Sequence, residues 1–195
     1  MSVHLSAASC IDWVARLTGA SGAAEVFQRA EAAGVANGPE IFLPYLSGER
    51  TPHNDAGIRG SFTGLGADTT RDDMARAVLE GVAFGLRDSQ RALEATGLRL
   101  ERLMAIGGGA RSRYWLKLIA TALDVTLELP AGGEFGAALG AARLGMVASG
   151  DASVGEVMTA PAISEEVAPD PALTAAFDDA YARFRAAYGP TREIQ

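Results

Sequence analysis

The feature that most constrains the fold of this chain is an alternation of strand and helix patterns in its second half. Residues 103–106 are apolar and run directly into Gly107-Gly108-Gly109-Ala110, and a helical pattern starts at Ser112. A second apolar stretch at 125–129 is followed, after a short turn, by another helical pattern at 135–148. Short apolar runs bounded by glycine and separated by helices are typical of an α/β domain.

Four further helices and two short strands are predicted around this unit. Apolar spacing predicts helices over residues 11–18, 22–33, 74–96 and 172–188, and strands over 41–46 and 60–65. Pro44 indicates that the first strand lies at an edge or ends early. Residues 69–73, two threonines followed by Arg71 and two aspartates, are predicted to supply the N-cap and acidic first turn of the long helix.

Helical spacing also predicts which residues face the core. The expected core positions are Ile11, Val14 and Leu17 in the first helix, Phe135, Ala138, Leu139, Ala142 and Met146 in the helix after the second strand, and Leu173, Phe177, Tyr181 and Phe184 in the last helix.

A long polar segment separates the two short strands. Residues 47–60 are rich in Gly, Pro, Asn and Asp. Loops of this length are uncommon in compact domains unless they have a function, so the segment is a candidate interface or active-site loop. An exposed hairpin is the alternative.

Length and charge exclude several classes of protein. The chain has 195 residues, enough for one domain, and a net charge of −7 with a pI near 4.9. Such an acidic balance argues against nucleic-acid or anionic-membrane binding, and no segment is apolar enough to span a membrane. The single cysteine, Cys10, cannot form an internal disulfide, which favours a reducing, cytoplasmic setting.

The strongest local chemical signal is the glycine-rich turn before Ser112. Glycines let the backbone adopt a positive φ and let a ligand approach closely, and the helix behind them presents free N–H groups. Arg111, Arg113 and Lys117 would add local positive charge. The turn lacks the Lys-Ser/Thr of a phosphate-binding loop and the third glycine of a dinucleotide fingerprint, so a tight structural turn is the alternative.

Residues for covalent or metal chemistry are scarce. His4 and His53 are the only histidines and Cys10 is the only thiol. This leaves no Ser-His-Asp triad and no Cys/His zinc site, so no catalytic or metal-binding residue is predicted. His53 is expected to form a local hydrogen bond.

With these segments in place, the chain resembles the C-terminal part of the FGGY carbohydrate kinases. Residues 60–65, a gap of seven, and then residues 73–80 fit the second signature of that family at every specified position. Further similarity lies in residues 5–10, 42–53, 107–112 and 137–142. Within the family, the sequence of residues 47–54 is most similar to that of the xylulose kinases.

The resemblance implies an actin-like ATPase, ribonuclease-H-like α/β domain over residues 1–195. It implies a C-terminal, nucleotide-binding domain truncated on its N-terminal side, without its first strands and without the sugar-binding domain. An exposed strand edge is therefore expected, with uncovered apolar surface at 41–46 or 103–106. Such an edge predicts self-association into a homo-oligomer.

The resemblance also assigns nucleotide-contacting positions. It places Gly108, Gly109 and Ala110 against adenosine, with Arg113 where the family has a polar residue on the following helix. It places Ala8 and Asp12 near the nucleotide from the first helix, although a solvated carboxylate is the alternative for Asp12. The implied cofactors are ATP and Mg²⁺, with the metal ligands and the catalytic aspartate outside this chain.

The function implied by the resemblance is the ATP-binding half of a sugar kinase. The full enzyme would transfer the ATP γ-phosphate to a ketopentose, D-xylulose, giving xylulose 5-phosphate, while this fragment alone would be inactive. Alternatives are a kinase for gluconate, ribulose or glycerol, or a free-standing actin-like module that binds nucleotide or protein without catalysis.

Overall fold

The computed structural model describes residues 1–35, 38–132 and 136–195. In chain order, the elements are α1 (Ser9–Thr18), α2 (Ala23–Ala32), β1 (Ile41–Leu43), β2 (Ser61–Thr63), α3 (Arg71–Glu94), β3 (Arg102–Met104), the 3₁₀ turn η1 (Gly108–Arg111), α4 (Arg113–Leu123), β4 (Thr126–Pro130), α5 (Gly136–Ser149), α6 (Val154–Val157), β5 (Ile163–Val167) and α7 (Thr174–Glu193). The predicted α/β order is confirmed.

The larger sheet has the order β3-β4-β5. β3 and β4 are parallel, with Leu103 opposite Leu127, and α4 makes the crossover between them. β5 runs antiparallel to β4 and was not predicted, because four of its five residues are exposed and three of its side chains are polar. Across the described residues, β3 has no strand on its other side, so an unpaired strand edge lies at residues 102–104, and Met104 and Ile106 are exposed beside it.

The smaller sheet pairs β1 with β2 in antiparallel register, Phe42 opposite Phe62. β1 ends at Leu43, directly before Pro44, as the sequence predicts. The expectation of uncovered apolar surface here is wrong, because Ile41, Phe42 and Leu43 are at most 6% exposed. The physical reason is that β1 packs against α3 and α7, which cover it.

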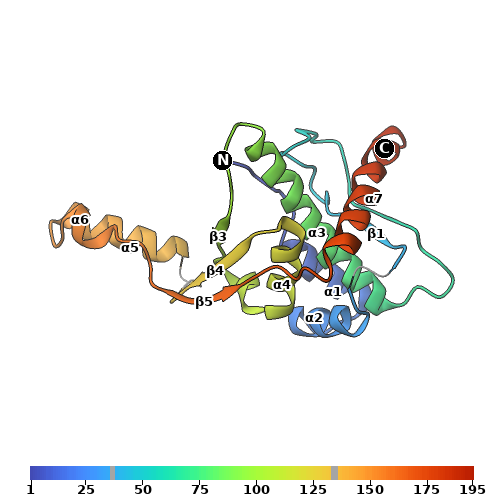
Figure 1. Ribbon diagram of the computed structural model, residues 1–195, viewed down its shortest axis with the longest axis horizontal. Helices are drawn as coiled ribbons and strands as arrows, with labels where there is room; N and C mark the ends of the chain where they lie inside the picture. Colours follow the sequence, from blue (N-terminus) through green and yellow to red (C-terminus); the bar gives the residue numbers. More distant parts are fainter. Residues whose placement is uncertain (36–37, 133–135) are drawn as a thin grey trace.

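The helix α3 is the central element of the molecule (Figure 1). It begins with a capping box, in which the Thr70 side chain accepts from the N–H of Asp73 and the Asp73 carboxylate accepts from the N–H of Thr70. β1 approaches α3 closely at Gly81, where an added Cβ would lie 2.2 Å from the Phe42 carbonyl oxygen. The helix therefore packs directly against the smaller sheet through β1, and against α4, which contacts β4 and β5 of the larger sheet.

The core consists of residues from α1, α2, α3, α4 and α7 together with both sheets. The predicted faces are confirmed for Ile11, Val14, Phe177, Tyr181 and Phe184, which are buried. The prediction that Leu17 is buried is wrong: Leu17 is 54% exposed, because the face of α1 that packs against α2 and α3 consists of Cys10, Ile11, Val14, Ala15 and Thr18. Leu173 is half-buried at the start of α7.

The prediction of a buried face on α5 is wrong. Leu139 is 40%, Leu144 63% and Met146 44% exposed, and α5 has no buried residue among those described. Figure 1 shows the reason: α5 and α6 extend away from the rest of the molecule, and only the first two turns of α5, residues 136–143, lie near Met104, Ile106 and the end of β4. Phe135 lies outside the described residues. No described helix has the length and apolar character needed to cross a bilayer.

Candidate nucleotide site

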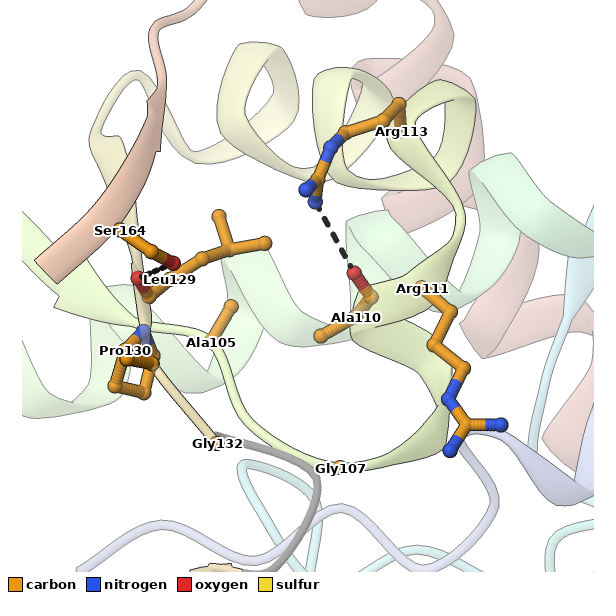
Figure 2. A pocket seen from close by; sticks show the side chains of 10 residues that line it. Ala105, Gly107, Ala110, Arg111, Arg113, Leu129, Pro130, Gly132 and Ser164 are labelled. Carbon is orange, nitrogen blue, oxygen red and sulfur yellow. Dashed lines mark hydrogen bonds between the residues drawn. The ribbon is translucent and has the colours of Figure 1, made fainter.

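A cavity of about 370 Å³ lies where the parallel strands β3 and β4 end (Figure 2). Ligands of α/β sheets bind at the carboxyl ends of their parallel strands, so the position is typical of a binding site. Its volume lies in the range of small-molecule pockets. The lining residues are Ala105, Gly107, Ala110, Arg111, Arg113, Leu129, Pro130, Ala131, Gly132 and Ser164.

The glycine-rich turn forms one wall of this cavity. Gly107 has φ of +90°, a conformation that favours glycine, and it turns the chain from β3 into η1. Ser112 then caps α4, since its hydroxyl accepts from the N–H of Trp115 at 3.2 Å, as the sequence predicts. The turn is therefore positioned by both flanking elements.

Gly109 has a packing role in addition to the nucleotide contact that the resemblance implies, which stays a prediction. It does not have a positive φ, and an added Cβ would meet Cζ3 of Trp115 at 2.6 Å. Gly109 is thus required by the packing of the turn against α4. Gly108 has open space around its Cα, with no described atom within 4 Å of an added Cβ.

Arg113 is the charged side chain directed over the cavity. Figure 2 shows its guanidinium pointing from α4 toward Ala110, whereas the side chain of Arg111 points away from the centre. Nη1 of Arg113 donates to the Ala110 carbonyl at 3.4 Å, and Nη2 forms an ion pair with Glu165 on β5. The pair is half exposed and contributes little to stability because solvent screens it.

Lys117 does not add positive charge to the cavity. Its Nζ donates to the carbonyls of Ala168 at 3.0 Å and Pro169 at 3.5 Å, which lie after β5. Lys117 lies one helical turn after Arg113 on α4, and its side chain reaches the segment that follows β5 at the edge of the sheet. Cations at a helix N-terminus are disfavoured by the helix dipole, so Arg111 and Arg113 do not stabilise α4 either.

The structure brings some of the predicted site residues together. Ala110 and Arg113 line the cavity, and Gly108 and Gly109 form η1 beside it. Ala8 and Asp12 are exposed at the start of α1 and do not line this cavity. Their contact with a nucleotide stays a prediction.

Several lining residues were not predicted from the sequence. Leu129, Pro130, Ala131 and Gly132 belong to the end of β4 and its turn, and Ser164 comes from β5, where its hydroxyl donates to the Leu129 carbonyl at 2.9 Å. Only the position of a turn after a predicted strand could have indicated residues 130–132. Ser164 had no signal, because β5 itself was not recognised.

The long polar loop has a structural role in this chain. The ring of His53 stacks on that of Tyr188 with centroids 3.7 Å apart, and its Nε2 lies 3.2 Å from the Tyr45 hydroxyl. Burial lowers the pKa of His53, although the nearby Asp88 carboxylate acts in the opposite direction. The expected local hydrogen bond of His53 is confirmed. The loop contains one antiparallel bridge, Glu49 with Asp55, and packs against α3 and α7 through His53 and Asp55, so it is a partly buried hairpin and not an exposed one.

No metal centre is found within residues 1–35, 38–132 and 136–195, where no three His, Cys, Asp or Glu side chains gather. A Mg²⁺ ion needs oxygen ligands. The carboxylate of Glu165, beside the cavity, already forms an ion pair with Arg113. The described residues therefore do not fit a resident magnesium site.

Comparison with known proteins places these features in a family. Residues 4–149 match the C-terminal domain of the FGGY family of carbohydrate kinases. The xylulose kinase of Escherichia coli is 42% identical over 189 residues, which cover 96% of this chain and 39% of that protein. The gluconokinase of Bacillus subtilis is 38% identical over 111 residues, covering 56% of this chain and 21% of that protein.

A solved structure gives the same result. The crystal structure of a "xyloylose kinase" from Brucella ovis superposes with a TM-score of 0.89 at 47% identity, covering all of this chain and 40% of that one. The chain thus spans about 40% of the length of these kinases.

Proposed function

The chain belongs to the FGGY family of carbohydrate kinases, and on that premise we propose that it is the ATP-binding half of a sugar kinase. The observation that carries the proposal is the cavity beside Gly107 at the carboxyl ends of β3 and β4, whose lining residues lie inside the family match apart from Ser164. The similarity to xylulose kinases supports D-xylulose as the sugar and xylulose 5-phosphate as the product.

The cavity suits the nucleoside part of ATP. Ala105, Leu129 and Pro130 offer an apolar surface for a base, and the backbone at Gly107 and Ala110 allows close approach. Phosphoryl transfer depends on positioning and on neutralising charge, so a domain that holds nucleotide needs no nucleophile of its own. Mg²⁺ would arrive with ATP and take its protein ligands from outside this chain.

We assign no catalytic residue to this chain. The resemblance places the catalytic aspartate outside this chain, and loss of a general base alone typically removes about 10²–10⁴-fold in rate, so this half is expected to turn over no sugar. It is expected to bind nucleotide weakly, because the turn at residues 108–110 would contact only the adenosine side. The sugar would be held outside the chain, and nothing in its charge favours a nucleic-acid or membrane partner. The cytoplasmic setting indicated by the single cysteine remains a prediction.

Two measurements test the proposal. Calorimetric titration of ATP and ADP into the 195-residue chain is expected to give weak binding to one site. A coupled assay with ATP and D-xylulose is expected to stay at background. Turnover above background would contradict the assignment of the catalytic machinery to a region outside this chain. Absence of nucleotide binding would overturn the proposed nucleotide-binding function.

Other family substrates remain as a second candidate, favoured by the similarity to a gluconokinase. A kinase for gluconate, ribulose or glycerol would bind ATP in the same way and differ in the sugar. A free-standing, non-catalytic module would bind nucleotide or protein alone. A coding region that continues upstream into an aspartate-containing first domain would favour the kinase over the module.

Self-association is also part of the proposal. Apolar side chains are exposed on α5, at Leu139, Leu144 and Met146, and beside the free edge of β3, at Met104 and Ile106. Exposed apolar surface next to an unpaired strand edge favours association between copies. We expect the chain to form a homo-oligomer through this surface.

A further inference from the structure

The strand β3 presents backbone groups to the open edge of the larger sheet (Figure 1). The carbonyl of Glu101 and the N–H of Ala105 bond to β4 at 3.4 and 2.8 Å. Backbone groups of successive residues in a strand point to opposite sides, so the groups of every second residue from Glu101 face β4. The N–H and C=O groups of Arg102 and Met104 therefore face the open edge, where the described residues supply no strand.

An apolar groove of about 400 Å³ lies beside this edge, between β3 and the helices α3 and α4. Ser89 and Gln90 are the only polar residues described as lining it, and none of the lining residues is charged. Leu103 and Ala105 of the strand segment both line the groove and pack against the core. A strand added beside β3 would extend the roof of this groove, so its side chains on that face must be apolar.

The edge segment of β3, residues 102–106, itself has the properties that such a strand needs. It contains no carboxylate, and its one charged group, the Arg102 guanidinium, is already paired with Glu128 and Glu166. Two copies of this segment can therefore approach each other without like charges meeting, although the whole chain carries a net charge of −7. Pairing would also enlarge a sheet of three strands, and sheets most often have about four to six.

We propose that two copies of this chain pair through β3 in antiparallel register, with Met104 opposite Met104, and form one continuous sheet. In this register Met104 exchanges two hydrogen bonds with its counterpart, and Arg102 of each copy exchanges two with Ile106 of the other. Leu103 of one copy then lies opposite Ala105 of the other on the groove face, so the apolar surface continues across the join. The inference deepens the self-association in the proposed function, on which it rests, by naming the strand and the register.

The first test removes a donor at the open edge. Met104→Pro deletes an N–H that does not bond to β4, and proline is tolerated on edge strands. Each pair of copies loses two hydrogen bonds, so the dissociation constant from analytical ultracentrifugation is expected to rise about tenfold or more. Met104→Leu keeps the N–H and an apolar side chain of similar size, and as the matched control it should stay within about threefold of the wild type.

The second test determines the register and does not depend on the folding of the proline variant. Met104→Cys would place two thiols opposite each other with Cα atoms about 5.5 Å apart, within the range of a disulfide. Oxidised glutathione is expected to convert this variant into a covalent dimer. The native Cys10 is 0% exposed, so the wild-type chain should form none, and Leu17→Cys, at a position on α1 that is 54% exposed, is the matched control.

The outcomes separate the inference from the rest of the proposed function. Association of Met104→Pro as tight as that of the wild type, with circular dichroism showing a folded chain, overturns the pairing of β3, and so does cross-linking of Met104→Cys no faster than that of Leu17→Cys. Self-association through another surface would survive both results. A wild-type chain that stays monomeric at every concentration overturns the inference and the self-association together, whereas nucleotide binding is measured independently of all three.

Discussion

Gly109 lies directly against the indole ring of Trp115, so close that an added Cβ would meet Cζ3 of the ring at 2.6 Å. The ring cannot easily move away, because Trp115 is 5% exposed and its Nε1 donates to the Leu79 carbonyl at 3.3 Å. The glycine turn of the candidate site is therefore joined to the core through one side chain.

Gly109→Ala is expected to destabilise the fold by about 1–3 kcal/mol, the usual cost of overpacking a filled site. The measurement is the free energy of unfolding from urea denaturation. A variant as stable as the wild type would show that η1 shifts without cost and that the contact with Trp115 is unimportant.

Gly108→Ala is the matched substitution one position earlier. No described atom lies within 4 Å of the added Cβ, so unfolding is expected to change by no more than about 0.5 kcal/mol. Nucleotide affinity should nevertheless fall, because the methyl group would stand on the wall that adenosine approaches. Unchanged ATP binding by calorimetry would place the nucleotide elsewhere.

The stacked pair His53 and Tyr188 predicts a pH dependence of stability. Burial lowers the pKa of His53 below its ordinary 6.5, so the folded chain binds this proton less tightly than the unfolded chain. The stabilising contribution is complete above pH 6.5 and is lost as the pH falls toward the folded pKa.

The variant for this test is His53→Phe, which keeps an aromatic ring against Tyr188 and removes the titrating group. Urea unfolding between about pH 8 and 5.5 should show a smaller loss of stability in the variant than in the wild type. Parallel losses in both proteins would mean that other groups account for the acid sensitivity.

A buried ion pair joins α3 to the residue before β1. Nη2 of Arg76 lies 2.6 Å from Oε2 of Glu40, with side-chain exposures of 2% and 5%, and Thr69 donates to the other carboxylate oxygen. Glu40→Gln is expected to cost up to about 3–5 kcal/mol of unfolding free energy, because it removes the nearer counter-charge of a buried guanidinium and leaves only Asp73, whose Oδ1 lies 3.7 Å from Nη2 of Arg76.

The control is Asp178→Asn, which breaks the pair with Arg87 at a carboxylate that is 56% exposed. Surface pairs contribute about 0–1 kcal/mol, so this variant should unfold almost as the wild type does. Similar losses in Glu40→Gln and Asp178→Asn would contradict the importance assigned to burial.

Exposed apolar residues on α5 predict concentration-dependent association. The double variant Leu144→Ser and Met146→Ser is expected to reduce the mean mass seen by light scattering at high protein concentration, because it removes apolar area from the contact. Leu17→Ser, at a leucine of similar exposure on α1, should leave the mass unchanged. A wild-type chain that stays monomeric at every concentration would contradict the proposed homo-oligomer.

Local patterns in the sequence determined the class of fold and the position of the candidate site. Helix starts at Thr70 and Ser112 were predictable because capping depends on side chains only a few residues from the backbone groups they satisfy. The turn at residues 107–111 was predictable for the same reason, since glycines between a strand and a helix affect the local backbone directly.

Only the tertiary structure decided which surfaces are covered and which side chains face the cavity. The apolar spacing of α5 is that of a buried helix, yet burial needs a partner surface, and none covers α5 among the described residues. The role of Gly109 likewise depends on its contact with Trp115, and that of Lys117 on its hydrogen bond to the segment after β5. Residue propensities and the spacing of apolar residues predict the secondary structure of each segment. The roles of these residues follow instead from packing between segments.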